Sequence, residues 1–319
     1  MQFTVYRLQF PNGVHFGAGT LWDSMNTLPA DTFFSALCQE ALSHDGETEL
    51  EALVAAARKG ALRLSDLFPF VGEELYLPKP LYPVTREQEG DSIVKKSFKK
   101  LKYIPASQWD TYLRGELNPV EAVGQLQQLG RYSVRTMSAS RAPEKLDSGD
   151  MLPYSVGVYR FRPNSGLYLI VGFADEKLQD HFDILLHSLS YSGIGGKRSA
   201  GLGRFTAEKM AIPAVLERQL HGNKTPCMAL SVCMAETDEL ESVMKGARYL
   251  LLKRSGFIAS PDYAPELRRK RDFYSFCAGS CFEKRFAGNI FDVGGSGAHP
   301  VYRYAAALWM EMGQCAAIN

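Results

Sequence analysis

The chain has 319 residues, of which 45% are hydrophobic, and its formal net charge is +1. This length favours two domains, and the near-neutral charge excludes a basic field over the whole surface, so any nucleic-acid binding must depend on local patches. No apolar run approaches the roughly 18 residues of a membrane helix, and the N-terminus does not resemble a signal peptide, so we expect a cytoplasmic protein that does not enter a membrane. The six cysteines contain no CxxC pair, which favours free thiols over a metal site.

The first 83 residues predict one strand, two helices and several short extended pieces. Residues 2–10 alternate apolar and polar side chains, as a strand does. Asp31 suits the N-cap of a helix that runs to about residue 42, and a second helix is predicted over 48–61. Prolines divide residues 64–83 into short extended segments.

The next 130 residues predict an insertion followed by the rest of a domain. Residues 86–150 lack a sustained apolar period. After them we expect two strands paired across a "PNSG" turn, a helix and a last strand, over 154–163, 166–174, 175–193 and 204–212. The order strand, helix, strand, strand, helix, strand predicts an α+β fold, a ferredoxin-like (RRM-like, βαββαβ) domain over 1–212 with the insertion at about 86–150.

The remainder of the chain, residues 213–319, predicts a weaker copy of the same arrangement. A linker over 213–224 precedes a strand, a helix over 237–254, strand-like pieces, a glycine-rich loop over 293–300 and a last strand over 301–310. Both halves therefore place a glycine-rich loop just before their last strand. We interpret the second half as a degenerate ferredoxin-like domain.

The stretch "GIGGKRSAGLG" (193–203) is the strongest candidate for a binding site. It has the form G-h-G, five residues with cations, then G-h-G, and it matches neither a P-loop nor a dinucleotide-binding fingerprint. Glycines let a backbone turn tightly and present N–H groups to an anion, and neighbouring cations neutralise phosphate. The expected RNA-binding residues here are Gly193, Gly195, Gly196, Lys197, Arg198, Ser199, Gly201, Gly203 and Arg204. The alternative is a flexible surface linker.

This glycine-rich pattern resembles the signature of the RAMP superfamily of CRISPR-associated RNA-binding proteins. The segment "LPADTFFSALCQEAL" (28–42) is similar to the first helix of the RAMP subunit that caps the crRNA 5′ end in type III complexes. Residues 134–157 resemble the family's middle motif, from which Arg135 and Arg141 are expected to bind RNA. The segment "GSGAHPVYRY" (295–304) resembles the fourth subunit of the type III-A Csm complex.

The resemblance implies two RAMP domains, a crRNA 5′ handle as ligand and no cofactor. It also implies two protein partners, the large polymerase/HD-type CRISPR subunit and the backbone RAMP subunit of the Csm complex. In the second glycine-rich loop, Gly294, Gly295 and His299 are expected to contact RNA, although His299 could instead order its own loop.

A lysine run in the insertion offers a second basic patch. The segment "KKSFKKLKYIP" (95–105) interleaves cations with Phe98 and Tyr103, a combination that suits a single-stranded RNA backbone and base stacking. The resemblance implies a hairpin thumb in this insertion, which makes Lys95, Lys96, Lys99 and Lys100 candidates for RNA binding. The alternative is a solvated basic excursion, and the cluster "LRRKR" (267–271) is likewise either solvated or a binding patch.

Histidine decides whether the chain could be an enzyme. We expect a non-catalytic subunit. The rival hypothesis is a metal-independent, crRNA-processing endoribonuclease of the same fold, with His15 as the general base on a 2′-hydroxyl. A third hypothesis is a ferredoxin-like metabolic enzyme that binds a phosphorylated small molecule.

Overall fold

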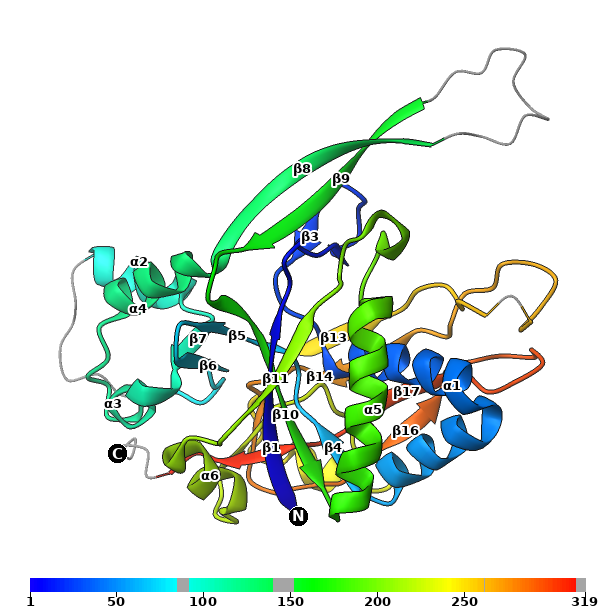
Figure 1. Cartoon of the computed structure of the whole chain (residues 1–319). Helices are drawn as coiled ribbons and strands as arrows, with labels where there is room; N and C mark the ends of the chain where they lie inside the picture. The colour runs from blue at the N-terminus through cyan, green and yellow to red at the C-terminus, as the bar shows by residue number, and fades with distance from the viewer. Residues whose placement is uncertain (85–91, 140–151, 261, 314–319) are drawn as a thin grey trace.

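One large antiparallel sheet organises the first half of the chain. The computed structural model describes residues 1–84, 92–139, 152–260 and 262–313. The sheet has the order β11-β1-β10-β5-β6-β7, and β4 also pairs with β10 (Figure 1). Its strands are β1 (Gln2–Gln9), β4 (Leu62–Leu64), β5 (Phe68–Val71), β6 (Glu74–Pro78), β7 (Tyr103–Pro105), β10 (Ser165–Phe173) and β11 (Thr206–Met210).

Both faces of this sheet are covered, which explains why β10 is an unbroken apolar run. Helices α1 (Ala30–Arg58) and α5 (Glu176–Ser192) pack on one face, where Leu37 and Leu185 meet Leu169 of β10. On the other face Ile170 joins a second core with Met310 from near the C-terminus. A strand buried on both faces favours continuous hydrophobic residues over alternation.

The predictions for strand 2–10, helix 175–193 and strand 204–212 are confirmed by β1, α5 and β11. The two early helices are also confirmed as one element, α1, which is interrupted at Asp45 and Gly46, where the backbone is not helical. Asp31 does not cap α1, because Pro29 is the N-cap.

The predicted pairing across the "PNSG" turn is wrong. The ten residues of β9 (Leu152–Phe161) pair with β8 (Gly130–Ala139) in a hairpin, while β10 pairs with β1, β4 and β5. Figure 1 shows this β8–β9 hairpin projecting away from the sheet. The proline-rich segment after α1 supplies the sheet partner instead, so the insertion is longer than 86–150 and includes β9.

Apart from strands β7, β8 and β9, the insertion is mostly helical. It contains α2 (Ser92–Lys100), α3 (Trp109–Leu113) and α4 (Pro119–Leu126), with two short 3₁₀ turns at Ala106–Gln108 and Gln127–Leu129. Two-residue strands β2 (Phe16–Gly17) and β3 (Ser24–Met25), which precede the insertion in the chain, form a small ribbon beside β9.

No helix among the described residues is long and apolar enough to cross a membrane.

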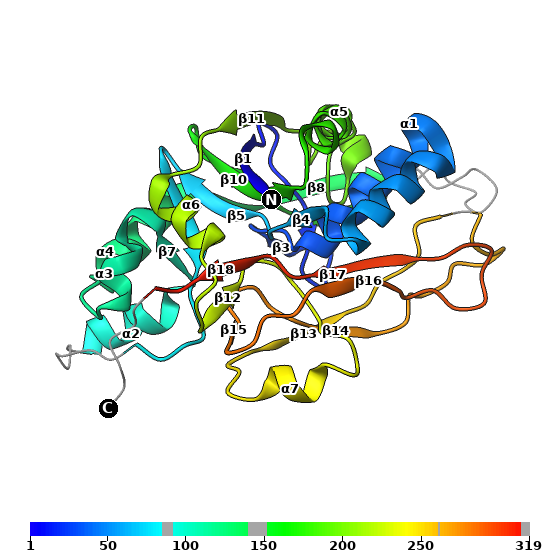
Figure 2. The ribbon, with the colours of Figure 1, turned by 90° about the horizontal axis from the view of Figure 1, so that it is seen from below.

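The second half consists of three small sheets below the first half, as Figure 2 shows. They contain β12 (Cys227–Ala229) with β15 (Cys281–Phe282) and β18 (Trp309–Glu311), β13 (Leu251–Arg254) with β14 (Phe273–Phe276), and β16 (Gly288–Asp292) with β17 (Tyr302–Ala306). The expected linker 213–224 is largely helix α6 (Ala214–His221).

Two further predictions for the second half are wrong. The helix expected over 237–254 is only α7 (Leu240–Met244), because Lys245 is extended and Gly246 has a φ of +71°, after which β13 begins. The last run, 301–310, is not one strand but β17 and β18, which belong to different sheets.

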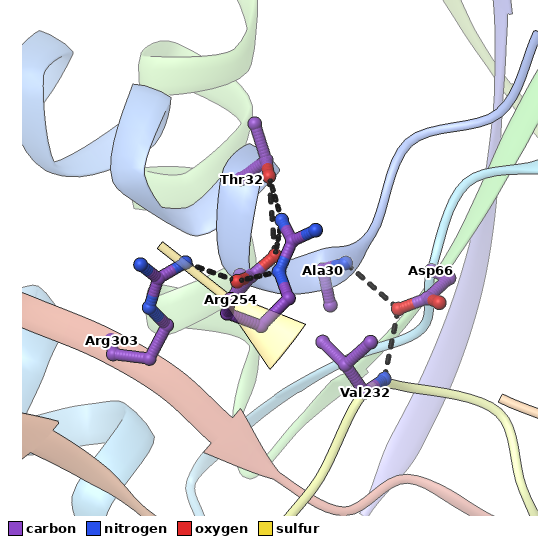
Figure 3. A network of polar contacts seen from close by, with 7 residues as sticks. Ala30, Thr32, Asp66, Val232, Arg254 and Arg303 are labelled. Carbon is purple, nitrogen blue, oxygen red and sulfur yellow. Dashed lines mark hydrogen bonds and ion pairs between the residues drawn. The ribbon is translucent and has the colours of Figure 1, made fainter. Parts of the chain in front are cut away.

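Buried polar groups hold the two halves together (Figure 3). Asp31 at the start of α1 accepts hydrogen bonds from Arg254 of β13, at 2.8 Å to each oxygen, and from Arg303 of β17. Burial alone would raise the pKa of Asp31, but Arg254 and Arg303 hold it below its usual range. The halves therefore share one continuous structure instead of meeting through a linker.

Candidate nucleic-acid interface

The glycine-rich loop 193–203 connects the end of α5 to β11, and most of its backbone amides are used inside the protein. Gly193 closes the helix by donating to the Leu189 carbonyl at 2.7 Å, and Ile194 donates to Gly203 at 2.9 Å. Gly196 and Gly203 donate to the carbonyls of His15 and Gly13, at 2.9 and 3.0 Å. The loop is thus attached to the segment that follows β1.

Close packing explains several of the glycines. A Cβ at Gly203 would lie 2.0 Å from the Ile194 carbonyl oxygen, and one at Gly195 would lie 2.8 Å from the His15 carbonyl oxygen. Gly203 also has a φ of +78°, a conformation that favours glycine. These glycines therefore build the loop, and the expectation that each presents an N–H group to a ligand is wrong for Gly193, Gly196 and Gly203.

At the tip of the loop, several backbone amides have no hydrogen-bond acceptor within the described part of the chain. Within the described part of the chain, no acceptor contacts the backbone amides of Gly195, Lys197, Arg198 and Ser199. Arg198, Ser199 and Arg204 are exposed, and Lys197 is half-buried. The tip is therefore a surface where cations and amides are available to an anion.

Lys197 links the loop to the β8–β9 hairpin. Its Nζ donates to the Tyr154 hydroxyl at 3.2 Å and lies 4.5 Å from the centre of that ring. Leu202 of the same loop packs against Val156 and Val158 of β9 in a small apolar cluster. The predicted RNA-binding loop and the hairpin are therefore parts of one surface.

The hairpin carries the predicted Arg135 and adds Arg131, Tyr132 and the neighbouring Trp22, which the sequence analysis did not single out. Arg131 and Arg135 are exposed on β8, and so is Tyr132, whose hydroxyl donates to the Trp22 carbonyl. The Trp22 side chain is 62% exposed, although its backbone lies so close to Gly157 that a Cβ there would be 2.6 Å from the Trp22 oxygen. An exposed tryptophan in a glycine-rich turn was the available signal for this site.

His15 is buried beneath the same loop. His15 is only 7% exposed, and its Nδ1 lies 2.7 Å from the Gly157 carbonyl oxygen. Its ring packs against Gly196. This environment suits a residue that joins the loop to the hairpin.

The candidate lysines of the insertion lie on α2 and not on the hairpin. Lys95, Lys96, Lys99 and Lys100 are exposed along this helix, which confirms a basic surface but not a lysine-bearing thumb. Phe98 is half-buried, stacks on Tyr112 at 6.3 Å, and lies under the Lys79 Nζ at 3.7 Å. It therefore packs into the protein instead of offering a free face to a base.

The second glycine-rich loop is closed around its own side chains. The Asp292 carboxylate accepts hydrogen bonds from the amides of Gly294 and Val301, at 2.8 and 2.9 Å, while Gly295 donates to the Tyr263 hydroxyl at 2.6 Å. His299 is exposed, and its Nε2 lies 2.8 Å from Ser260 Oγ. The amides of Gly294 and Gly295 therefore already donate hydrogen bonds within the protein.

Arg141, the other arginine predicted from the middle motif, lies outside the described residues.

Comparison with known proteins places the chain in a family. The family model described as the CRISPR Csm4 C-terminal domain matches residues 223–312. The Csm4 protein of Mycobacterium tuberculosis is 38% identical over 318 residues, which cover 99% of this chain and all of that protein. The chain belongs to the Csm4 family.

Other relatives and structures agree with membership of the Csm4 family. Streptococcus thermophilus Csm4 is 36% identical over 98% of this chain and 99% of its own length. A crystal structure of a Csm3–Csm4 subcomplex has a similar fold, with a TM-score of 0.65 at 16% identity over 96% of this chain and 98% of that one. A Csm1–Csm4 cassette with pppApA has a TM-score of 0.59 at 18% identity, over 97% of each chain. The resemblance to the fourth subunit of a type III-A Csm complex is thereby confirmed.

Proposed function

We propose that this Csm4-family subunit is a non-catalytic RNA-binding protein that grips the repeat-derived 5′ handle of crRNA for antiviral defence in the cytoplasm. The observation that carries the proposal is the single surface formed by the tip of loop 193–203 and the β8–β9 hairpin. Arg198, Arg204, Arg131 and Arg135 supply exposed cations there. Single-stranded RNA binds to surfaces that combine cations for phosphates with aromatic rings for bases, and no cofactor is needed for this.

Each part of this surface has a distinct role in the proposal. The amides of Lys197, Arg198 and Ser199 donate to a phosphate that the arginines neutralise. On the opposite face of the hairpin, the exposed rings of Trp22 and Tyr132 stack on unpaired bases. Because the glycines hold the loop against His15 and Leu202 holds it against the hairpin, the groups are positioned before RNA binds.

The same proposal includes two ferredoxin-like RAMP domains, over 1–212 and 213–319. The strand order β11-β1-β10-β4 with two helices on one face supports the first of them. We propose that the large polymerase/HD-type subunit and the backbone RAMP subunit bind this chain. The support is that relatives of known structure form a Csm1–Csm4 cassette and a Csm3–Csm4 subcomplex.

The test is the double substitution Lys197→Ala with Arg198→Ala. We expect the affinity for the handle RNA that co-purifies with the complex to fall about tenfold or more. The slope of log K against log[salt] should become shallower by about 1.4, since each lost phosphate contact contributes about 0.7 for a single strand. Fluorescence anisotropy over a salt series measures both quantities.

The matched control replaces two exposed cations of the second half, Lys245→Ala with Arg248→Ala. Equal affinity of the Lys197/Arg198 variant and the wild type, with an unchanged melting temperature, would overturn the proposal. Metal-independent cutting of repeat RNA that is lost in His15→Ala would instead favour the endoribonuclease. The buried position of His15 gives that alternative no support.

A further inference from the structure

Lys197, at the tip of loop 193–203, has a backbone conformation that lysine rarely adopts. Its φ is +60° and its ψ is +31°, in the left-handed region. Among the described residues the other non-glycine position with a positive φ is Asn164, a residue type that tolerates this region. Glycine would adopt this conformation without strain, and five glycines stand in the same loop. The strain therefore indicates that the lysine side chain is needed at this position.

A tyrosine of the β8–β9 hairpin holds the end of this side chain. The Lys197 Nζ donates a hydrogen bond to the Tyr154 hydroxyl oxygen at 3.2 Å and lies 4.5 Å from the centre of the ring. The Tyr154 hydroxyl donates in turn to Met137 Sδ at 3.8 Å, directly across the hairpin, so its oxygen is available as an acceptor. A cation within about 6 Å of an aromatic ring is attracted to its face. The hydroxyl and the ring therefore both hold the ammonium group in place.

The tyrosine partner fixes the position of the Lys197 charge without neutralising it. Lys209 on β11, the strand that follows the loop, forms an ion pair with the Asp183 carboxylate, which neutralises its charge. By contrast, no acidic residue occurs in loop 193–203 or in strands β8 and β9. Because a phenol is uncharged at neutral pH, the full positive charge of Lys197 is available to an anion.

The same contact places Lys197 on the face of the hairpin that carries Arg135. Arg135 lies directly across from Val156 in the β8–β9 register, and Val156 packs against Leu202 of the loop. Residues directly opposite each other in an antiparallel pair share a face, so the exposed Arg135 is on the side that faces the loop. Lys197 and Arg135 are therefore cations of one surface, and Arg198 is exposed beside them at the tip.

We propose that Tyr154 is a positioning residue for RNA binding, which directs the Lys197 ammonium toward a phosphate of the bound strand. A long lysine side chain loses rotamer freedom when it contacts a phosphate. Because Tyr154 orders this side chain before RNA arrives, part of that entropy loss occurs during folding and not during binding. The inference rests on the proposed function, since it assumes that RNA binds at the tip of the loop.

The experiment measures fluorescence anisotropy of a labelled synthetic copy of the co-purified handle RNA with the full chain. Lys197→Ala should weaken binding about fivefold, and Tyr154→Leu, which removes the ring and the hydroxyl, about threefold. Tyr154→Phe keeps the ring and should lose less than about twofold. The double variant of Tyr154→Leu with Lys197→Ala should bind no more than about sixfold more weakly than the wild type, because without the ammonium the tyrosine has no cation to direct. Tyr154→Met replaces Tyr154→Leu in this cycle if the leucine variant melts below the wild type.

The backbone of Lys197 supplies an independent test. Lys197→Gly and Lys197→Ala both remove the ammonium, but only glycine relieves the left-handed strain. The two variants should bind RNA equally weakly, while the glycine variant should melt about 2 °C above the alanine variant. Tyr274→Leu, at a tyrosine of the second half that is 51% exposed, is the matched control for Tyr154→Leu and should bind like the wild type.

The inference is overturned if the losses of Tyr154→Leu and Lys197→Ala multiply to about fifteenfold in the double variant, as those of independent residues would. It is also overturned if Tyr154→Leu binds RNA like the wild type, or if Lys197→Gly melts no higher than Lys197→Ala. In each of these cases, a loss of affinity in Lys197→Ala leaves the proposed function standing. If Lys197→Ala and the Lys197/Arg198 variant both bind like the wild type, the proposed function fails as well.

Discussion

The two glycine-rich loops differ in the groups that their backbone amides contact. Loop 193–203 uses its glycines to pack against His15, and its tip carries exposed cations with unused amides. Loop 293–300 surrounds the Asp292 carboxylate, which already occupies the amides of Gly294 and Val301. The amides of a glycine-rich loop can thus stay unused at the surface or be engaged by a carboxylate of the protein, and the position of one acidic side chain decides which.

The largest expected effect concerns the backbone of the first loop. Gly203→Ala should lower the free energy of unfolding by about 3 kcal/mol, because the residue has a positive φ and its new Cβ would collide with the Ile194 carbonyl. Urea denaturation measures the change. Gly295→Ala in the second loop is the control, since the nearest atom to its Cβ would be 3.8 Å away, and it should change stability by less than about 0.5 kcal/mol. Similar losses in both variants would show that the two loops are packed alike.

An intermediate effect is expected when the first loop is given a carboxylate of its own. Ser199→Asp places a negative charge among the exposed cations of the tip and should weaken handle-RNA binding about fivefold, through repulsion of phosphate. The comparison is with Ser199→Asn, which has the same shape and no charge and should bind like the wild type. Anisotropy at low and high salt measures both, and the difference should narrow as salt increases. Unchanged binding by the aspartate variant would place the RNA elsewhere.

The smallest effect concerns the carboxylate of the second loop. Asp292→Asn should lower the free energy of unfolding at neutral pH by about 0.5–1 kcal/mol, because charge-assisted hydrogen bonds become neutral ones at an exposed site. Burial would raise the pKa of Asp292, but the amides of Val301 and Gly294 hold it below its usual range. A lowered folded-state pKa gives stability above the unfolded-state pKa that is lost as the pH falls through the folded one. The difference in melting temperature between variant and wild type should therefore disappear in acid; a difference that persists there would contradict this assignment.

How far the site was predictable differs between its parts. The cations of loop 193–203 and the apolar helix before it were visible in the sequence because glycine spacing and helical periodicity are local properties. Trp22 and Tyr132 were missed, although Trp22 stands in a glycine-rich turn, because only the fold shows that both rings are exposed and that the Tyr132 hydroxyl contacts the Trp22 carbonyl. The lysines of 95–100 are exposed, and their role in RNA binding stays a prediction, but they lie on helix α2 and not on a hairpin.

By itself the sequence determined the family, β1, α1, α5 and β11, and the existence of a basic glycine-rich turn, because all of these follow from short-range patterns. Only the tertiary structure decided that β9 leaves the sheet to pair with β8, that His15 is buried, and that Lys197 contacts Tyr154 of the hairpin. The physical reason is that strand partners, burial and hydrogen-bond partners come from residues far apart in the chain. Their energies depend on which groups the whole fold brings into contact.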